Sequence, residues 1–448
     1  MSRLSHLLLA TALPMVVALP MGAALTAWAQ SPAPAVPAVE VMKMPPLPLA
    51  KVAVPDGKTL DLNIGLGSGA FRSTVDEQGI IWSITDRGPN IDCADANALT
   101  GRSTALMCAG DASGKIFPMP AFTPTIYKLR LTPAGAVEVL AALPLKGTSG
   151  KPITGLPNPL THASTEVAYG IDGKAIAPDP SGLDTEAVVR LADGTFWLAE
   201  EYGPSLVEVA PDGTIRRRLV PAGVEADLAK ADYPVEGILP AILARRQINR
   251  GIENLALSPD GAFLYVLMQS PLANPDAAAF RQSPLARLVK VERATGKVVG
   301  EYLYGEDDPT TFRADNAQKP QKQSDVRMSD MVAVGTDRLI VLERISKTTK
   351  LYLVDLKDAV PVPAAFDDPK ASPALEQLHA DQFAANGLKP LTKTLILDSD
   401  DLKDMPSKIE SVAVLSDRDL VLVTDSDFGI DGATTQVLRL RFPTPVLR

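Results

Sequence analysis

A short pattern that occurs five times limits the folds available to this chain. Its clearest copy runs from Gly182 to Tyr202, with an acid (Glu186), an apolar strand, an Asp193-Gly194 turn, a second strand and closing acids. Alternating strands joined at an Asp-Gly turn are typical of a β-hairpin. Because a hairpin returns the chain to the place where it began, we expect the opening and closing acids at the same end of the unit.

The other copies follow the same plan. Three of them open on an acid, at Glu253, Asp330 and Glu410. In the same order they close at Met268-Gln269, Glu343-Arg344 and Asp425. The most divergent copy has Phe71 in place of the opening acid and closes at Asp86-Arg87. Repeated hairpins of one design indicate a propeller or a solenoid.

Further strands are expected after the inner hairpins. They span residues 126–131 with 137–143, 206–209 with 215–220, 288–292 with 298–303, 350–355 and 437–442. Two hairpins make a four-stranded blade, so we predict an all-β protein, a β-propeller of four-stranded blades with loop insertions. Five inner hairpins are visible, and six or seven blades remain open. A strand at 51–64 could pair with C-terminal elements, or a blade could lie near 161–174. A helix is expected within 233–250.

The composition is that of a globular protein with many turns and an acidic balance. Apolar residues make up 46% of the 448 residues, and the 39 prolines and 31 glycines suit a turn-rich fold around a large core. The formal net charge is −9, which makes nucleic acid and anionic membrane surfaces poor partners. Cations are better suited to such a chain.

The first fifty residues predict export. Residues 1–29 have a basic start at Arg3, an apolar stretch at 7–25 and an A-x-A site at 27–29, so we expect a signal peptide cleaved near Ala29. Residues 30–50 are rich in Pro and Ala and predict a linker to a single domain at 51–448. An uncleaved membrane anchor is the alternative, and Pro14, Pro20 and the linker disfavour it. The protein is therefore expected in the periplasm or secreted, with no stable membrane insertion after cleavage.

Cys93 and Cys108 are the two cysteines of the chain, fifteen positions apart in a loop after the first hairpin. In an exported protein such a pair most simply forms one disulfide. A metal pair would lack companion ligands, and a nucleophilic cysteine would leave its neighbour without a role. We therefore predict a structural disulfide between Cys93 and Cys108.

The repeated acids indicate a cation site. If the hairpins form a ring, the opening acids converge on the central channel together with some of the closing acids. The metal-ligand candidates are Glu186, Glu253, Asp330, Glu410, Asp86 and Asp425. Calcium fits this set best, because it accepts several carboxylate oxygens without strict geometry. A zinc site is not expected, since neither His162 nor His379 lies at metal-binding spacing.

The closing segments supply further candidates. Glu200, Glu201 and Glu343 are candidate catalytic acids, together with Glu253. Arg87 and Arg344 each follow a closing acid, where a guanidinium could bind a phosphate or carboxylate in a bidentate manner. The alternative is that these arginines pair with the acids and hold neighbouring blades together. Nucleophilic serine catalysis has little support, because the chain has no G-x-S-x-G motif.

Several of these stretches resemble a known family. They are Gly182-Leu-Asp-Thr-Glu-Ala187, Glu200-Glu-Tyr-Gly-Pro204, Asn249-Arg-Gly-Ile-Glu-Asn254, Leu339-Ile-Val-Leu-Glu-Arg344, Lys408-Ile-Glu-Ser411 and Thr424-Asp-Ser-Asp-Phe428. Over residues 65–441 the chain is similar to the family named "esterase-like activity of phytase", the phytase-like exported proteins of bacteria. The chain departs from the family where Glu-Gly is usual, with Glu186-Ala, Glu253-Asn and Glu410-Ser, and Gln269 replaces a Glu. These changes affect the fine shape of the site.

The resemblance implies a hydrolase of phosphate or carboxylic esters. Together with the acids, it predicts an exported, calcium-dependent enzyme that acts on a small-molecule ester, with Glu201 or Glu253 as general base and Arg87 and Arg344 holding the anionic product. Two alternatives remain: a non-catalytic ligand- or protein-binding propeller with a structural metal, and a lactonase-type propeller hydrolase that prefers neutral cyclic esters. We expect a monomer.

Overall fold

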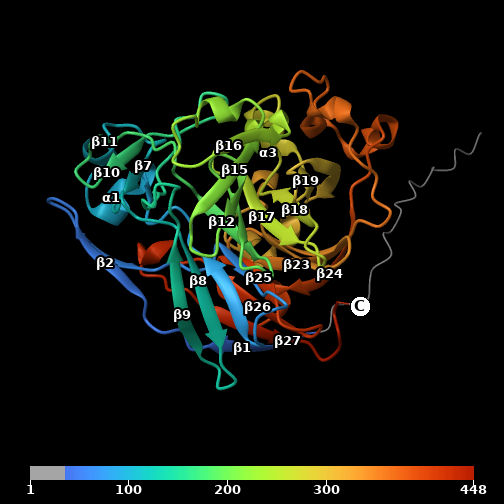
Figure 1. The fold of residues 1–448 in the computed structure, drawn as a ribbon, viewed down its shortest axis with the longest axis horizontal. Helices are drawn as coiled ribbons and strands as arrows, with labels where there is room; N and C mark the ends of the chain where they lie inside the picture. The colour runs from blue at the N-terminus through green and yellow to red at the C-terminus, as the bar shows by residue number, and fades with distance from the viewer. Residues whose placement is uncertain (1–35, 448) are drawn as a thin grey trace, which may run out of the picture. The chain divides into compact units, whose positions relative to one another are not determined.

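Most of the β-structure lies in sheets that each combine one inner hairpin with the strands that follow it (Figure 1). The computed structural model describes residues 36–447, so the predicted signal peptide at 1–29 lies outside the described residues. The few helices are short, because Gly-containing turns and prolines interrupt the chain between strands. The prediction of an all-β chain of four-stranded blades is confirmed.

The blades follow one another along the sequence. Blade 1 comprises β4 (Gly69–Phe71), β5 (Ile80–Ile84), β8 (Thr125–Leu131) and β9 (Val137–Pro144). Blade 2 comprises β12 (Thr185–Arg190), β13 (Phe196–Glu200), β14 (Ser205–Val209) and β15 (Ile215–Pro221), with β16 (Val235–Leu239) added in parallel. Blade 3 comprises β17 (Ile252–Leu257), β18 (Phe263–Met268), β19 (Leu285–Glu292) and β20 (Val298–Gly305). Blade 4 comprises β21 (Arg327–Gly335), β22 (Arg338–Arg344), β23 (Thr349–Asp355) and β24 (Thr392–Asp398). Blade 5 comprises β25 (Ile409–Val414), β26 (Asp419–Thr424), β27 (Val437–Arg441) and β1 (Ala38–Met42).

The innermost strands form a closed ring. β4 contacts β12, β12 contacts β17, β17 contacts β21, β21 contacts β25, and β25 contacts β4. Residues 36–447 therefore form a propeller of five blades, one for each inner hairpin of the sequence. The six or seven blades that the sequence left open are not formed, because the N-terminal strand completes the fifth blade rather than adding another.

Part of the range predicted as a linker, 30–50, is β-structure. β1 pairs antiparallel with β27, with Ala38 opposite Arg441, and β2 (Pro48–Ala53) pairs with β3 (Thr59–Asn63). The strand expected at 51–64 is thus a hairpin, and an earlier segment closes the ring. Four of the five residues of β1 are exposed, so backbone pairing holds the strand and no apolar alternation marks it in the sequence.

A small lobe is inserted next to blade 1. It comprises β6 (Ile91–Asp92), α1 (Ala96–Thr100), α2 (Thr104–Met107), β7 (Lys115–Phe117), β10 (Ala168–Gly170) and β11 (Ala175–Ile176) (Figure 1). The predicted disulfide between Cys93 and Cys108 is present, with 6.1 Å between the two Cα atoms. Both cysteines are fully buried in an apolar cluster that the lobe shares with residues of the β2–β3 hairpin, such as Leu60 and Leu62. The disulfide therefore has a structural role.

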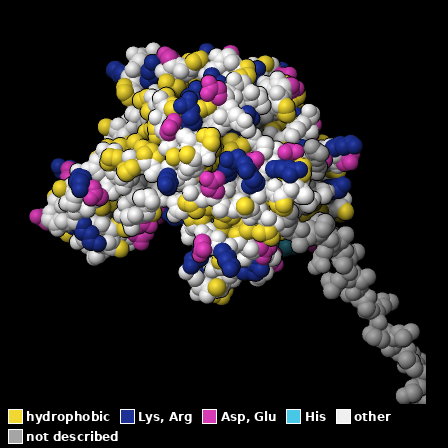
Figure 2. Space-filling model, turned by 90° about the horizontal axis from the view of Figure 1, so that it is seen from below, with side chains coloured by type: hydrophobic (Ala, Val, Ile, Leu, Met, Phe, Trp, Pro, Cys, Tyr) yellow, Lys and Arg dark blue, Asp and Glu magenta, His cyan; other side chains and the backbone are white. Residues whose placement is uncertain are grey.

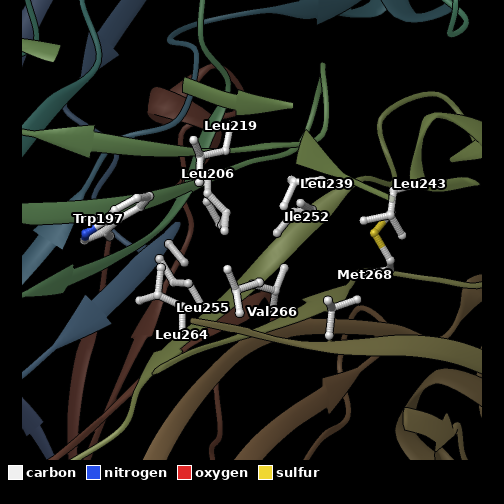
Figure 3. Packing of buried hydrophobic residues seen from close by; sticks show 14 of the residues in the cluster. Trp197, Leu206, Leu219, Leu239, Leu243, Ile252, Leu255, Leu264, Val266 and Met268 are labelled. Carbon is white, nitrogen blue, oxygen red and sulfur yellow. The ribbon is translucent and has the colours of Figure 1, made fainter. Parts of the chain in front are cut away.

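Apolar side chains pack between successive blades. Between blades 2 and 3, Trp197 and Leu206 face Leu255 and Leu264, and all are 1% exposed or less (Figure 3). Each buried side chain of this size contributes about 1.5–3 kcal/mol to folding. The inner strands are largely apolar for this reason, and Glu186, Glu253 and Glu410 each lie at the second position of their strand.

The helix expected within 233–250 is not formed. The segment contains β16 and a 3-10 helix at Ala241–Arg245, because Pro234 and Pro240 interrupt any α-helix there. The described residues contain two short α-helices besides α1 and α2 of the lobe, namely α3 (Ala277–Gln282) and α4 (Arg313–Asn316). Within the described part of the chain, no helix is long and apolar enough to cross a membrane.

Charges are mixed on the face drawn in Figure 2. Hydrophobic side chains form several separate groups there, and Lys/Arg and Asp/Glu side chains lie side by side between them. This face therefore carries no continuous field of one sign.

Candidate functional site

Three of the opening acids occupy the same position of a β-bulge. The register of the inner hairpin shifts between Thr185 and Ala187, between Ile252 and Asn254, and between Ile409 and Ser411. Glu186, Glu253 and Glu410 are therefore the extra residues of their bulges. A bulge turns a side chain away from the ordinary pleat. Its position at the start of the inner strand places these acids at the end of the ring where the hairpins open.

Asp330 does not belong to this set. In blade 4 the register shifts between Met328 and Asp330, so Ser329 is the bulged residue. Asp330 lies one position further and accepts hydrogen bonds from the backbone N–H of Ala70 (3.4 Å) and Val412 (2.8 Å), which belong to blades 1 and 5. The alignment of Asp330 with the other opening acids is thus wrong by one residue. Its carboxylate links three inner strands instead of facing the other acids.

Five acids form a cluster at the mouth of the ring. Carboxylate oxygens of Asp86, Asp184 and Glu186 lie within 4.8 Å of one another, and so do those of Glu186, Glu201 and Glu253. The two groups share Glu186. We call these five residues the acidic mouth. Asp184 was not among the predicted ligands, although it stands two positions before Glu186 in the same opening segment.

The neighbouring cations do not balance the carboxylates of the acidic mouth. Burial and the neighbouring carboxylates raise the pKa of Glu186 and Glu253 well above the ordinary range. Burial and Asp184 also raise the pKa of Glu201 to about 7, although Arg250 and Arg87 oppose the shift. One oxygen of Glu201, Oε1, is buried without a hydrogen-bond partner. Clustered carboxylates of this kind either hold protons or bind a cation.

The donor atoms fit calcium. All the available ligands are carboxylate oxygens, which hard cations such as calcium prefer, and neither histidine nor cysteine joins the groups. Of the predicted ligands, the structure brings Asp86, Glu186 and Glu253 together. Glu410 and Asp425 lie next to them, and the charge of Glu410 contributes to the raised pKa of Glu253. Burial and Glu410 raise the pKa of Asp425 to about 7.

Two of the candidate catalytic acids have structural partners. Glu200 is fully buried and accepts a hydrogen bond from the Arg218 guanidinium at 2.6 Å. Glu343 is also fully buried and accepts bonds from the Tyr304 hydroxyl and the Lys393 ammonium, both at 2.8 Å. Because these carboxylates are enclosed by donors inside the blades, they lie apart from the acidic mouth. Glu201 and Glu253 are the catalytic candidates that reach it.

Both predicted substrate-binding arginines are held by carboxylates. Arg87 Nε donates to Asp184 Oδ2 at 2.6 Å, and its guanidinium also pairs with Glu166. Arg344 pairs with Glu410 and donates to Ser329 Oγ at 2.8 Å. These contacts agree with the alternative interpretation, in which the two arginines pair with acids and hold neighbouring elements together.

Two other arginines face the cavity above the acids. The cavity has a volume of about 740 Å³, and its lining includes Arg250, Arg327, Gln269 and several residues of the lobe. Arg250 has a buried NH1 and Arg327 a buried Nε without hydrogen-bond partners. Burial and the charges of Arg250 and Arg344 lower the pKa of Arg327 to about 9. Neighbouring guanidinium groups with unpaired N–H groups are suited to bind an anion. Sequence reasoning missed them, although Arg250 lies in the Asn249-Arg-Gly-Ile-Glu stretch.

Backbone strain is concentrated at the same cavity. Asn249, Lys408 and Asp427 line it with φ angles of 54°, 54° and 43°, in the left-handed region that non-glycine residues rarely adopt. Asn249 Oδ1 accepts a hydrogen bond from Arg87 at 3.0 Å, and Lys408 pairs with Asp427. Conformations of this kind often occur at ligand sites, where the surrounding structure maintains them.

The fold and the site together define a five-bladed propeller with a cluster of carboxylates at one mouth and two unpaired arginines beside it. The chain belongs to the phytase-like family described as "Esterase-like activity of phytase", which matches residues 69–428. The resemblance inferred from the sequence is confirmed over this range.

A named relative gives little further detail. An "Uncharacterized secreted protein" of Arthroderma benhamiae is 26% identical over 298 residues, which cover 60% of this chain and 55% of that protein. The chain thus spans about half the length of this relative.

Solved structures show only a weak likeness to this chain. The PQQ-bound aldose sugar dehydrogenase of Streptomyces coelicolor is 8% identical and covers 91% of this chain and 99% of its own, with a TM-score of 0.30. Virginiamycin B lyase of Staphylococcus aureus is 8% identical, and the match covers 91% of this chain and 99% of the lyase, with a TM-score of 0.31. At these scores the likeness carries no argument, and the fold assignment rests on the sheet topology.

Proposed function

We propose that the chain is an exported, calcium-dependent hydrolase of small phosphate or carboxylic esters. The observation that supports this most is the pairing of opposite charges at one cavity. The acidic mouth lies next to the cavity, where Gln269 of the cavity wall donates to Glu253 at 2.7 Å, and the unpaired N–H groups of Arg250 and Arg327 lie on the same wall. A cation and an anionic substrate group together would balance both sets of charges. Two unpaired guanidinium groups favour a phosphate ester over a neutral one.

The acidic mouth would hold the metal. Asp86, Asp184, Glu186 and Glu253 are the ligands that the geometry supports, and bound calcium would polarise the ester and stabilise the negative charge that develops during hydrolysis. Arg250 and Arg327 would orient the anionic group. Glu201, with one buried oxygen free of hydrogen bonds, would accept a proton from the attacking water.

Export is part of the proposal. A disulfide persists in oxidising compartments, and the Arthroderma benhamiae relative is described as secreted. Both are compatible with the signal peptide predicted at 1–29 and with a location in the periplasm or outside the cell. Fractionation of the producing cells, with N-terminal sequencing of the exported protein, would show cleavage near Ala29 or reject it.

The first experiment is thermal unfolding with calcium and with a chelator. A ligand that binds only the native state adds about 2.7 kcal/mol at a hundredfold excess over its dissociation constant. We expect calcium to raise the melting temperature, and the increase to disappear in Glu186→Gln. Glu138→Gln, on the exposed outer strand β9, is the matched control and should keep it. Equal melting in calcium and chelator would reject the metal site.

The second experiment separates the candidate functions. p-Nitrophenyl phosphate, p-nitrophenyl acetate and a neutral lactone are offered to the calcium-loaded protein. Turnover of the phosphate ester that Arg250→Gln weakens supports the proposal in its phosphate form. Preference for the lactone would favour a lactonase-type hydrolase. Calcium-dependent stability without turnover of any ester would favour a binding propeller with a structural metal.

A further inference from the structure

A second cavity lies at the opposite end of the ring. It has a volume of about 610 Å³ and is lined by residues of all five blades, at the end where the inner hairpins turn. We call it the far mouth. Pockets of this size are typical of small-molecule sites, about 300–1,000 Å³. None of its lining residues belongs to the acidic mouth or to the cavity above it.

The wall of the far mouth is largely apolar. Phe71, Leu257, Val334 and Val414 come from four different blades, and Leu447 near the C-terminus completes the rim. Each of these side chains is only partly buried, so apolar surface remains available inside the cavity. A ligand that covers this surface must therefore have an apolar body.

One charged residue of the far mouth has no partner. Arg72 follows β4 and lines the cavity, and its Nε is buried without a hydrogen-bond acceptor. The nearby turn acids are engaged with their own backbone: Asp193 accepts from Thr195 N at 2.9 Å, and Asp260 from Ala262 N at 3.0 Å. An unpaired guanidinium on an apolar wall is suited to a ligand carboxylate.

The other arginines of the far mouth are already engaged. Arg190 pairs with Asp76 at 3.3 Å and lies over the Trp82 ring, and Arg293 Nε donates to the Gly261 carbonyl at 2.6 Å. Arg72 is therefore the residue that can meet an incoming anion without losing an existing contact. It fixes where the charged group of a ligand would lie.

We propose that the far mouth is a binding site for a small amphipathic carboxylate, with its apolar body against the blade ends and its carboxylate on Arg72. The site is independent of the ester hydrolysis proposed above, because it shares no residue with the acidic mouth. Binding there should therefore require no calcium.

The test uses decanoate as the probe and isothermal titration calorimetry of the purified protein. We expect saturable binding of one decanoate, equal in calcium and in chelator, and decane-1-ol as the uncharged analogue should bind more weakly. In Arg72→Gln the affinity should fall by about tenfold or more, the effect of losing a charge-assisted hydrogen bond. Arg281→Gln, an exposed arginine of α3, is the matched control and should bind decanoate like the unmodified protein.

A second variant tests the site independently, in case Arg72→Gln does not fold. Val414→Trp fills the cavity from the end of β25 and leaves Arg72 in place, so decanoate binding should also be lost while the calcium-dependent melting shift is kept. The proposal is overturned if the unmodified protein shows no saturable binding. It is equally overturned if both Arg72→Gln and Val414→Trp, shown to be folded by their melting curves, bind decanoate unchanged. Neither result would affect the calcium site.

Discussion

Blades 2 and 4 are built from the same hairpin, yet they bring opposite charges to the mouth of the ring. Blade 2 places Glu186 at its bulge and Glu201 after its second strand, whereas blade 4 has Ser329 and Arg344 at the matching positions. The backbone is the same in both, because the pairing of the inner strands does not depend on which side chain occupies the bulge.

The difference shows how a symmetric ring acquires a directional site. Acids gather on the side of blades 1 to 3, and Arg327 and Arg344 lie on the side of blade 4. A substrate with one anionic group and one reacting bond could then bind in one orientation only, with its anion toward the arginines. Blade 4 keeps an acid near its bulge, Asp330, but uses it to join inner strands.

The largest effect is expected when the acidic side is removed. Glu186→Ala combined with Glu253→Ala deletes the two bulged acids of blades 2 and 3. Calcium affinity should fall by more than about 100-fold, since even indirect supports of a metal site are worth 10–100-fold. Calorimetric titration with calcium measures this. Glu77→Ala with Glu138→Ala, two exposed acids of blade 1, is the control and should not change the affinity. Full hydrolytic activity in the first double variant would exclude this site.

Asp330→Ala should change stability and leave the metal site intact. Without the carboxylate, the buried N–H of Val412 loses its acceptor, which costs about 1–3 kcal/mol. We expect urea unfolding to give a lower midpoint, corresponding to a free energy of unfolding about 2 kcal/mol smaller, and calcium should add the same stability as in the unmodified protein. If the calcium increment disappeared instead, Asp330 would belong to the site after all.

The stability of the protein should depend on pH through Asp307, which pairs with Lys350 and Lys393 on the outer strands of blade 4. Burial alone would raise the pKa of Asp307, but Lys393 and Lys350 outweigh it and lower the pKa to about 2. A lowered pKa contributes stability that is present above the ordinary value near 4 and is lost as the pH falls through about 2. The contribution is about 2 kcal/mol. Asp307→Asn should unfold more easily at pH 6 and lose less stability between pH 4 and pH 2. Parallel curves for the two proteins would contradict the assignment.

The smallest effect is expected when one arginine of blade 4 is replaced. Arg327→Gln should raise KM for p-nitrophenyl phosphate by about tenfold, because one charge-assisted hydrogen bond is lost. The value of kcat should change less, and a neutral ester should be affected little. Steady-state kinetics on the two substrates, with Arg281→Gln as control, measure the difference. Equal losses on both substrates would remove Arg327 from anion binding.

The repeat made much of the fold predictable. Asp-Gly turns and apolar alternation mark the inner hairpins, and the opening acids Glu186 and Glu253 were found from their position in the repeat. The number of blades was left open because four of the five residues of β1 are exposed, so no apolar alternation marks this strand in the sequence. Asp330 was misplaced because a bulge shifts the register by one residue, and a one-residue shift cannot be seen when serine and aspartate stand side by side.

The site depended on contacts that the repeat does not encode. Arg250 and Arg327 lie just before β17 and at the start of β21, each three positions before an opening acid of the sequence pattern, but the pattern gave these positions no role. Arg87 and Arg344 were visible in the pattern. That Glu166, Asp184 and Glu410 lie close enough to pair with them could not be predicted, because these residues are distant in the sequence.

The pairing of β1 with β27 has a consequence for how the chain is made. Ala38 lies opposite Arg441, so the first strand of the described residues pairs with the last. The ring therefore stays open until synthesis is almost complete, and contacts this distant in sequence form slowly. Under the export proposed above, this delay would help the chain to stay unfolded, since the closing strand pair cannot form before its C-terminal partner has arrived on the same side of the membrane.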